Sequence, residues 1–143
     1  MIVTAVDSNV LIDVLFGDNQ FAQTSASSLS QCSQEGTVVI SAVVMAEVAS
    51  YFAHATDAVS FFDRTRIAVS DFGVQSAMEA GQLWRDRVNK DRSRILPDYM
   101  VAAHAVNHAD RLLTRDMGFN RMGVPGLVVV TPTDLMAAEP DRE

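Results

Sequence analysis

Four acidic residues in this sequence, Asp7, Glu47, Asp98 and Asp116, could together carry out metal-dependent chemistry. Each follows a short segment with the composition of a buried strand, or lies in a helix expected to pack beside one. Because ligands bind beyond the carboxyl ends of parallel strands, the four side chains are expected to converge there. Clustered carboxylates repel one another unless a cation binds between them. The pattern therefore predicts a divalent metal site and metal-assisted phosphate chemistry.

Each acid also has an ordinary structural interpretation. Asp7 and Asp98 could be helix N-caps, and Asp116 could be a turn residue. Glu47 is more informative because its helix is apolar almost all round, and it shares a stripe with apolar residues at i−3, i+1 and i+4. That pattern predicts a buried carboxylate, which is costly without a partner. The alternative is that Glu47 lies on the one wet edge of the helix.

Short apolar segments alternate with helical segments along the chain. We predict strands at 2–6, 37–40, 67–69, 111–114 and 127–130. Helices are predicted at about 10–15, 20–34, 41–52, 56–65, 70–89 and 98–108, with a short helix after residue 132. A loop at 117–126 ends in Pro125-Gly126, a turn signal. This alternation predicts an α/β fold with a parallel sheet of about five short strands and helices on both faces.

The 143-residue chain has the size and composition of one globular domain, expected at 1–135 with a short C-terminal tail at 136–143. It is 48% hydrophobic, which disfavours a disordered chain. No apolar segment approaches the roughly 20 residues of a membrane span, and no basic segment precedes the first strand, so neither a membrane anchor nor a signal peptide is expected. Cys32 is the only cysteine, which excludes an intrachain disulfide and favours a reducing cytoplasmic setting.

The formal net charge of −7 argues against a protein that coats nucleic acid by bulk electrostatic attraction. A local basic surface is still expected, because five of the eleven basic residues lie between positions 85 and 94. Within this segment Arg87, Lys90 and Arg92 are candidates for phosphate contact, and Arg115, next to Asp116, is another. The alternative is a solvated helix end with i,i+4 ion pairs.

Four motifs resemble those of the PIN-domain nucleases, in the same order and without an insertion. Asp7-Ser8-Asn9 resembles the first acidic motif and Ala46-Glu47-Val48 the second. Pro97-Asp98-Tyr99 opens an Ala-rich helix like the third motif, and Thr114-Arg115-Asp116 opens the Thr-x-Asp-x-x-Phe pattern of the fourth. No single motif is specific, but the ordered set extends from residue 2 to about 132. The length is most similar to that of the bacterial VapC-type toxins of toxin–antitoxin pairs.

This resemblance implies a small Rossmann-like PIN domain with Mg²⁺- or Mn²⁺-dependent endoribonuclease activity. Asp7, Glu47, Asp98 and Asp116 would be catalytic and hold one or two metal ions. Ser8, Asn9 and Thr114 would orient the carboxylates or metal-bound water, with Ser8 standing where Thr is common. The resemblance further implies an RNA substrate, a homodimer in the bacterial cytoplasm and a VapB-like antitoxin partner.

Two other functions use the same residues. A PIN-like module could bind RNA or a protein without cutting, or a nuclease could act on DNA or another phosphodiester. Zinc is disfavoured because His104 and His108 have helical spacing but no clear third ligand. The absence of a Gly-rich phosphate loop disfavours an NTPase, and Asn9 disfavours a phosphoaspartate phosphatase.

Overall fold

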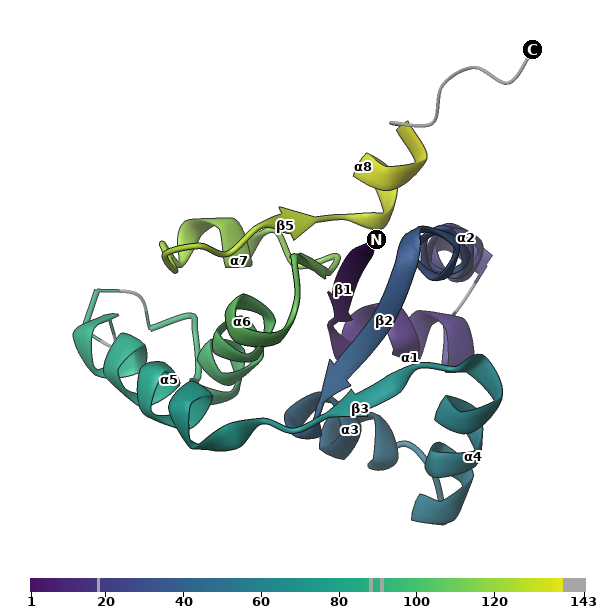
Figure 1. The fold of residues 1–143 in the computed structure, drawn as a ribbon, viewed down its shortest axis with the longest axis horizontal. Helices are drawn as coiled ribbons and strands as arrows, with labels where there is room; N and C mark the ends of the chain where they lie inside the picture. Colours follow the sequence, from purple (N-terminus) through teal and green to yellow (C-terminus); the bar gives the residue numbers. More distant parts are fainter. Residues whose placement is uncertain (18, 88, 91, 138–143) are drawn as a thin grey trace.

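A five-stranded, all-parallel sheet forms the centre of the computed structural model, which describes residues 1–17, 19–87, 89–90 and 92–137 (Figure 1). The strand order is β3-β2-β1-β4-β5. The strands are β1 (Ile2–Val6), β2 (Gly36–Ser41), β3 (Ala68–Ser70), β4 (Arg111–Leu113) and β5 (Val129–Val130). Thr4 of β1 lies in register with Val38 on one side and Arg111 on the other. The predicted five-stranded parallel sheet is therefore confirmed.

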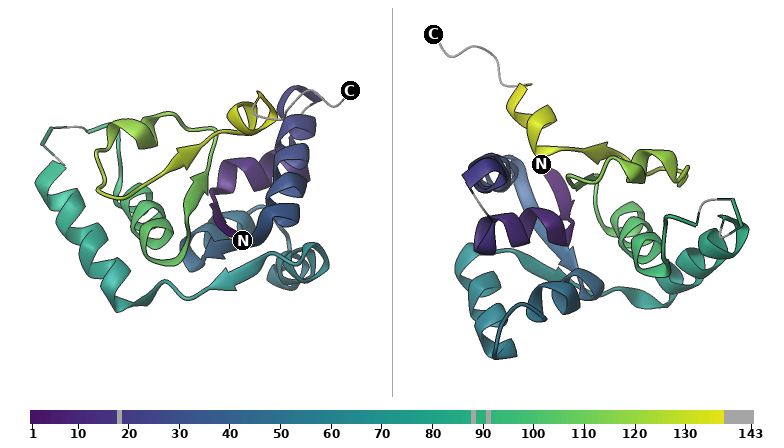
Figure 2. Two further views of the ribbon diagram at one scale, coloured as in Figure 1. Left: turned by 45° about the horizontal axis from the view of Figure 1, so that its top comes forward. Right: turned by 180° about the vertical axis from the view of Figure 1, so that it is seen from behind.

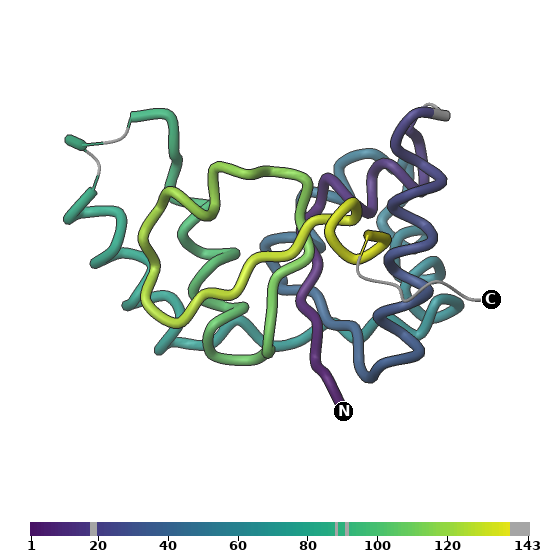
Figure 3. Tube along the Cα trace, turned by 90° about the horizontal axis from the view of Figure 1, so that it is seen from above, coloured from purple at the N-terminus to yellow at the C-terminus, as the bar shows by residue number. Residues whose placement is uncertain are grey.

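Helices cover both faces of this sheet (Figures 1 and 2). The chain from β1 to β3 runs through helices on one side, and the chain from β3 to β5 returns on the other, as right-handed crossovers require. Seen from above, α5 and α2 lie at opposite ends of the molecule with the strands between them (Figure 3). The helices are α1 (Ser8–Phe16), α2 (Asn19–Glu35), α3 (Ala42–Ala49), α4 (Ala55–Thr65), α5 (Gly73–Arg87), α6 (Leu96–His108), α7 (Gly118–Arg121) and α8 (Pro132–Ala137).

The core lies between the sheet and these two helical layers. Val6, Ile40 and Leu112 on the three inner strands are buried, as is Phe62 of α4. Cys32 is also fully buried and is a free thiol. The Ala-rich α6 packs against β1 and β4, since its small side chains let the helix approach the sheet closely. None of the described helices is both long enough and apolar enough to span a membrane.

Several element boundaries differ from the predicted ones. The last strand pairs only at 129–130, because a turn from Val124 to Leu127, with Gly126 at φ 80°, occupies the start of the predicted segment. The second helix runs directly into β2 at Gly36, where an added Cβ would lie 1.9 Å from the carbonyl oxygen of Ile2. The predicted loop 117–126 contains the short helix α7. Residues 136–137 of the predicted tail belong to α8, and its remainder lies outside the described residues.

Candidate active site

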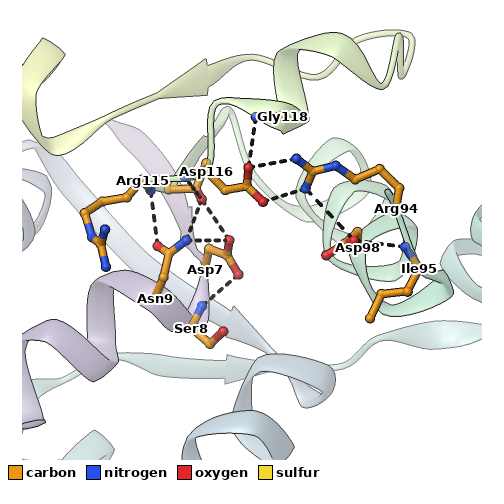
Figure 4. A network of polar contacts seen from close by, with 10 residues as sticks. Asp7, Ser8, Asn9, Arg94, Ile95, Asp98, Arg115, Asp116 and Gly118 are labelled. Atoms are coloured by element: carbon orange, nitrogen blue, oxygen red, sulfur yellow. Dashed lines mark hydrogen bonds and ion pairs between the residues drawn. The ribbon is translucent and has the colours of Figure 1, made fainter. Parts of the chain in front are cut away.

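The candidate site lies at the carboxyl ends of β1 and β4, the two strands where the chain order of the sheet reverses (Figure 4). Such a reversal opens a crevice beyond the strand ends, because the helices that follow leave on opposite faces. Asp7 directly follows β1, and Thr114 to Asp116 follow β4. The backbone N–H of Asp7 donates to the carbonyl oxygen of Leu113 at 2.9 Å, so the two strand ends are joined at the site itself.

Asp7 is buried, with 7% of its surface exposed, and its carboxylate is held on both oxygens. Oδ1 accepts the backbone N–H of Ser8 at 2.8 Å, and Oδ2 accepts the hydroxyl of Thr114 at 2.8 Å. Burial raises the pKa of Asp7, and the charges of Asp98 and Asp116 raise it further, whereas the two hydrogen bonds lower it. Asp7 is also the N-cap of α1, so its structural and chemical interpretations are compatible.

Asn9 and Thr114 connect the two loops that carry acids. The amide nitrogen of Asn9 lies 3.3 Å from Oδ2 of Asp7 and 3.2 Å from the Thr114 hydroxyl. The Asn9 side-chain oxygen accepts the backbone N–H of Arg115 at 3.1 Å, and the Thr114 hydroxyl oxygen accepts that of Asp116 at 3.0 Å. These contacts fix the orientation of Asp7 relative to Asp116.

Glu47 reaches the site from α3, where the Ser8 hydroxyl donates to Oε2 at 3.2 Å. The prediction that this residue is buried is wrong: Val44 and Val48 face the core, but Glu47 lies on the exposed side of the helix. The helix is only eight residues long, and Ala46 and Glu47 lie on its exposed side. Partial desolvation of the carboxyl raises its pKa, and repulsion from Asp7 and Asp98 adds to the effect.

Asp98 lies in the first turn of α6, where its Oδ2 accepts the backbone N–H of Ile95 at 3.1 Å. The N-cap of α6 is Ile95, so Asp98 is not the N-cap considered for it but accepts the N-cap backbone N–H from the third helical position. Nη1 of Arg94 lies 4.0 Å from the same oxygen, Oδ2. Asp98 therefore both caps its helix and stands beside the other acids (Figure 4).

Asp116 is bound by an arginine that the sequence did not single out. Arg94 contacts both carboxylate oxygens, with Nη1–Oδ2 at 2.5 Å and Nη2–Oδ1 at 2.8 Å. Oδ1 also accepts the backbone N–H of Gly118 at 2.9 Å. The Arg94 hydrogen bond holds the pKa of Asp116 below its usual range, against a smaller opposing effect of burial. Arg94 belongs to the basic segment and is four residues from Asp98, a spacing that could have identified it.

Arg115 points away from the acids and pairs with Asp13 of α1. Its guanidinium makes two contacts with the Asp13 carboxylate, one of them Nη2–Oδ1 at 2.8 Å, and it stacks over Phe21 with Cζ 4.2 Å from the ring centre. Asp13 is buried and also accepts the Ser25 hydroxyl at 3.0 Å. No local pattern indicates that these two residues, 102 positions apart, form a pair.

The remaining candidates for phosphate contact lie at the end of α5 and in the segment before α6. Lys90 and Arg92 are exposed, and Nη2 of Arg87 donates to the carbonyl oxygen of Gly123 at 3.0 Å. Arg92 and Arg94 line a cavity of about 390 Å³ together with Trp84. Arg94, at the end of the basic segment, lies beside Asp98, and Arg115 lies on the other side of the acids (Figure 4).

The PIN domain family profile matches residues 4–125. The chain belongs to the PIN-domain family. No curated protein sequence matches it. Among solved structures, this PIN domain is similar to VapBC2 from Rickettsia felis bound to a promoter DNA fragment, with a TM-score of 0.67, 22% identity and coverage of 90% of this chain and 98% of the other.

Two further structures have the same fold. VapBC-1 from nontypeable Haemophilus influenzae gives a TM-score of 0.66 at 19% identity, covering 92% of this PIN domain and 98% of the matched chain. VapC20 from Mycobacterium tuberculosis is described as a toxin that cleaves the sarcin–ricin loop. It gives a TM-score of 0.63 at 16% identity, covering 87% of this PIN domain and 98% of the matched chain. The expected resemblance to VapC toxins is thus confirmed at the level of fold.

The carboxylates of the PIN domain fit a hard divalent cation by their chemistry. Carboxylate oxygens are the donors that Mg²⁺ and Mn²⁺ select. Desolvation raises the pKa of Asp7 and Glu47, the charges of neighbouring acids raise it further, and a bound cation would relieve that repulsion. As the side chains stand, no three His, Cys, Asp or Glu residues of the described ranges are grouped closely enough to bind an ion.

His104 is buried and its ring centre lies 4.8 Å from that of His108.

Proposed function

We propose that this PIN domain is a metal-dependent endoribonuclease and the toxin of a two-protein toxin–antitoxin pair. The observation that carries the proposal is the approach of acids from β1, α3 and α6 at one sheet edge, where desolvation and the charges of neighbouring acids raise the pKa of Asp7 and Glu47. Bringing like charges together costs free energy, and a bound cation would offset that cost. Membership of the PIN family and the VapC-like fold support the same function.

In this proposal Asp7, Glu47 and Asp98 hold one Mg²⁺ or Mn²⁺ ion. If Asp116 also binds metal, the site holds two ions; if it does not, the site holds one. A bound ion would supply Lewis-acid activation of the phosphodiester and of water. The chain's own neutral donors keep the acids in place: the Thr114 hydroxyl and Asn9 amide orient Asp7, and the Ser8 hydroxyl orients Glu47. Each of these donors leaves lone pairs of the carboxylate available for a cation.

RNA would enter across the basic segment, with Lys90 and Arg92 contacting backbone phosphates. Trp84, about a third exposed, lines the same cavity as Arg92 and offers a surface on which an unpaired base can stack. Arg87 is tied to the loop at Gly123 and would contribute mainly positive charge. Arg115 would contribute to RNA binding only by releasing Asp13.

An antitoxin partner is supported by two exposed aromatic residues that stack on each other near the ends of α1 and α3. Phe16 at the end of α1 is 49% exposed and stacks on Tyr51, which is 56% exposed, at 5.6 Å between ring centres. Exposed aromatic residues at this density suit a protein interface. The similar structures from Klebsiella pneumoniae and Neisseria gonorrhoeae are a toxin–antitoxin complex and FitAcB, so we propose that a VapB-like chain or a second copy covers this surface.

Cleavage of total bacterial RNA by the purified protein tests the proposal. The reactions would contain Mg²⁺, Mn²⁺ or EDTA, with Asp98→Asn as the matched variant and single-stranded DNA as a second substrate. Discrete RNA cuts that require both metal and Asp98 are expected. Cleavage that persists in EDTA or in Asp98→Asn would reject the mechanism. A folded, inhibitor-free protein that binds Mn²⁺ but cuts nothing would favour a PIN-like module that binds RNA or a protein without cutting it. Cleavage of DNA but not of RNA would favour a metal-dependent DNA nuclease.

A further inference from the structure

Arg94 is placed among the acids as a fixed positive charge. Its guanidinium contacts both oxygens of Asp116, and Nη1 is also 4.0 Å from Oδ2 of Asp98. Only 13% of the side chain is exposed, which is low for an arginine on a connecting segment. A two-pronged contact of this kind has a defined geometry, so the charge stays in one position (Figure 4).

The surroundings of Arg94 are shaped to receive it. A Cβ on Gly118 would lie 1.2 Å from Nη2 of Arg94, so a larger residue here would displace the guanidinium from its present position. The ring of Phe119 lies on another side, with its centre 5.5 Å from Cζ. Gly118 and Phe119 both belong to the short helix that follows Asp116, so one segment supplies the anchor, the space and the aromatic contact.

Beyond Arg94 lies a small polar cavity of about 240 Å³, lined by Ser93, Arg94, Gly118 and Arg121. Two of its four lining residues are arginines, and Arg121 is exposed. Such a lining suits an anion, and paired arginines match the geometry of a phosphate group. The cavity adjoins the acids through Arg94, which contacts Asp116 and stands beside Asp98.

We propose that Arg94 takes the place of a second metal ion at this site. Asp116 anchors its guanidinium, and Arg94 together with Arg121 binds a phosphate of the RNA backbone in the small cavity. One divalent ion is then held by Asp7, Glu47 and Asp98, and Asp116 is a positioning residue for Arg94. This inference rests on the proposed nuclease function.

Calorimetric titration of the EDTA-treated protein with Mn²⁺ tests the metal count. One ion per chain is expected for the wild type and for Asp116→Asn, whose affinity should stay within about threefold, whereas Asp98→Asn should bind at least about tenfold more weakly. A second Mn²⁺ in the wild type that disappears in Asp116→Asn would overturn the inference. Thermal melts of each variant establish that it is folded.

Binding of an uncleavable 2′-O-methyl RNA oligonucleotide tests the phosphate contact. Arg94→Met should lower the slope of log K against log salt concentration by about 0.7, as expected for one lost phosphate contact on a single strand. Arg94→Lys should restore most of the slope because it keeps the positive charge, and Arg121→Met should lower the slope by a similar amount to Arg94→Met. An unchanged slope in Arg94→Met would overturn the assignment; if that variant fails to fold, an unchanged slope in Arg121→Met, a substitution at an exposed position, overturns it.

The two proposals fail in different ways. Cleavage of RNA by a wild-type protein that binds two Mn²⁺ ions would reject only the role of Arg94. A wild-type protein that neither binds Mn²⁺ nor cuts RNA would reject the nuclease function and this inference with it.

Discussion

Arg115→Met should destabilise the protein, because Arg115 neutralises the buried carboxylate of Asp13. Removing one partner of a buried ion pair costs about 3–5 kcal/mol, since the other charge remains buried. The cost here is reduced because the Arg115 side chain is 32% exposed and Asp13 keeps the Ser25 hydroxyl at 3.0 Å. Loss of the cation–π contact with Phe21 adds about 0.5–1 kcal/mol. The free energy of unfolding should therefore fall by about 2–4 kcal/mol.

Urea denaturation followed by circular dichroism at pH 7 measures this change. The matched control is Arg92→Met, the same substitution at an exposed position of the basic segment, which should change stability by less than about 0.5 kcal/mol. Adding Asp13→Asn to Arg115→Met should recover part of the loss, because no buried charge is then left unpaired. Equal stability of Arg115→Met and Arg92→Met would refute the ion-pair argument and return Arg115 to the set of RNA contacts.

Three further predictions concern the acids and the buried histidine. In EDTA at pH 7, Asp7→Asn should raise the melting temperature. The pKa of Asp7 is raised in the folded state, so the stability that this carboxyl contributes is present at low pH and is lost as pH rises through that pKa. A lower melting temperature of Asp7→Asn would contradict this. Thr114→Val should weaken Mn²⁺ binding about 10–100-fold in calorimetry, with Thr114→Ser close to wild type; equal affinities would show that the hydroxyl does not orient Asp7. Burial and His108 lower the pKa of His104 to about 4, so the folded state resists its protonation and stability should fall by up to about 3 kcal/mol from pH 6.5 toward 4. His104→Gln should flatten this dependence in urea denaturation, and an unaltered pH profile would count against it.

Local sequence patterns predicted the sheet and the acids but not the cations that pair with them. Each strand is a short apolar segment, and each acid follows or adjoins one, so pattern and topology together placed Asp7, Asp98 and Asp116 at one edge. The pairing of Arg94 with Asp116 spans 22 residues and depends on how α6 packs, which periodicity does not encode. Burial of Glu47 was predicted wrongly because a short helix made almost entirely of apolar residues can still have one side exposed to solvent.

The pattern of ion pairs separates the acids that are neutralised from those that are left for the proposed metal ion. Arginines from distant segments neutralise the acids around the sheet: Arg115 binds Asp13, Arg111 binds Glu35, and Arg94 binds Asp116. Within the described residues, the hydrogen bonds to Asp7 and Glu47 come only from neutral groups.

Negative charge is therefore left uncompensated at the point where the proposed function requires a metal, and a phosphate would be repelled there until an ion binds. RNA affinity should accordingly rise with Mn²⁺ concentration in the wild type and much less in Asp7→Asn, where part of the repulsion is already gone. Anisotropy with an uncleavable oligonucleotide would show this, and RNA binding that is equally tight in EDTA would contradict it.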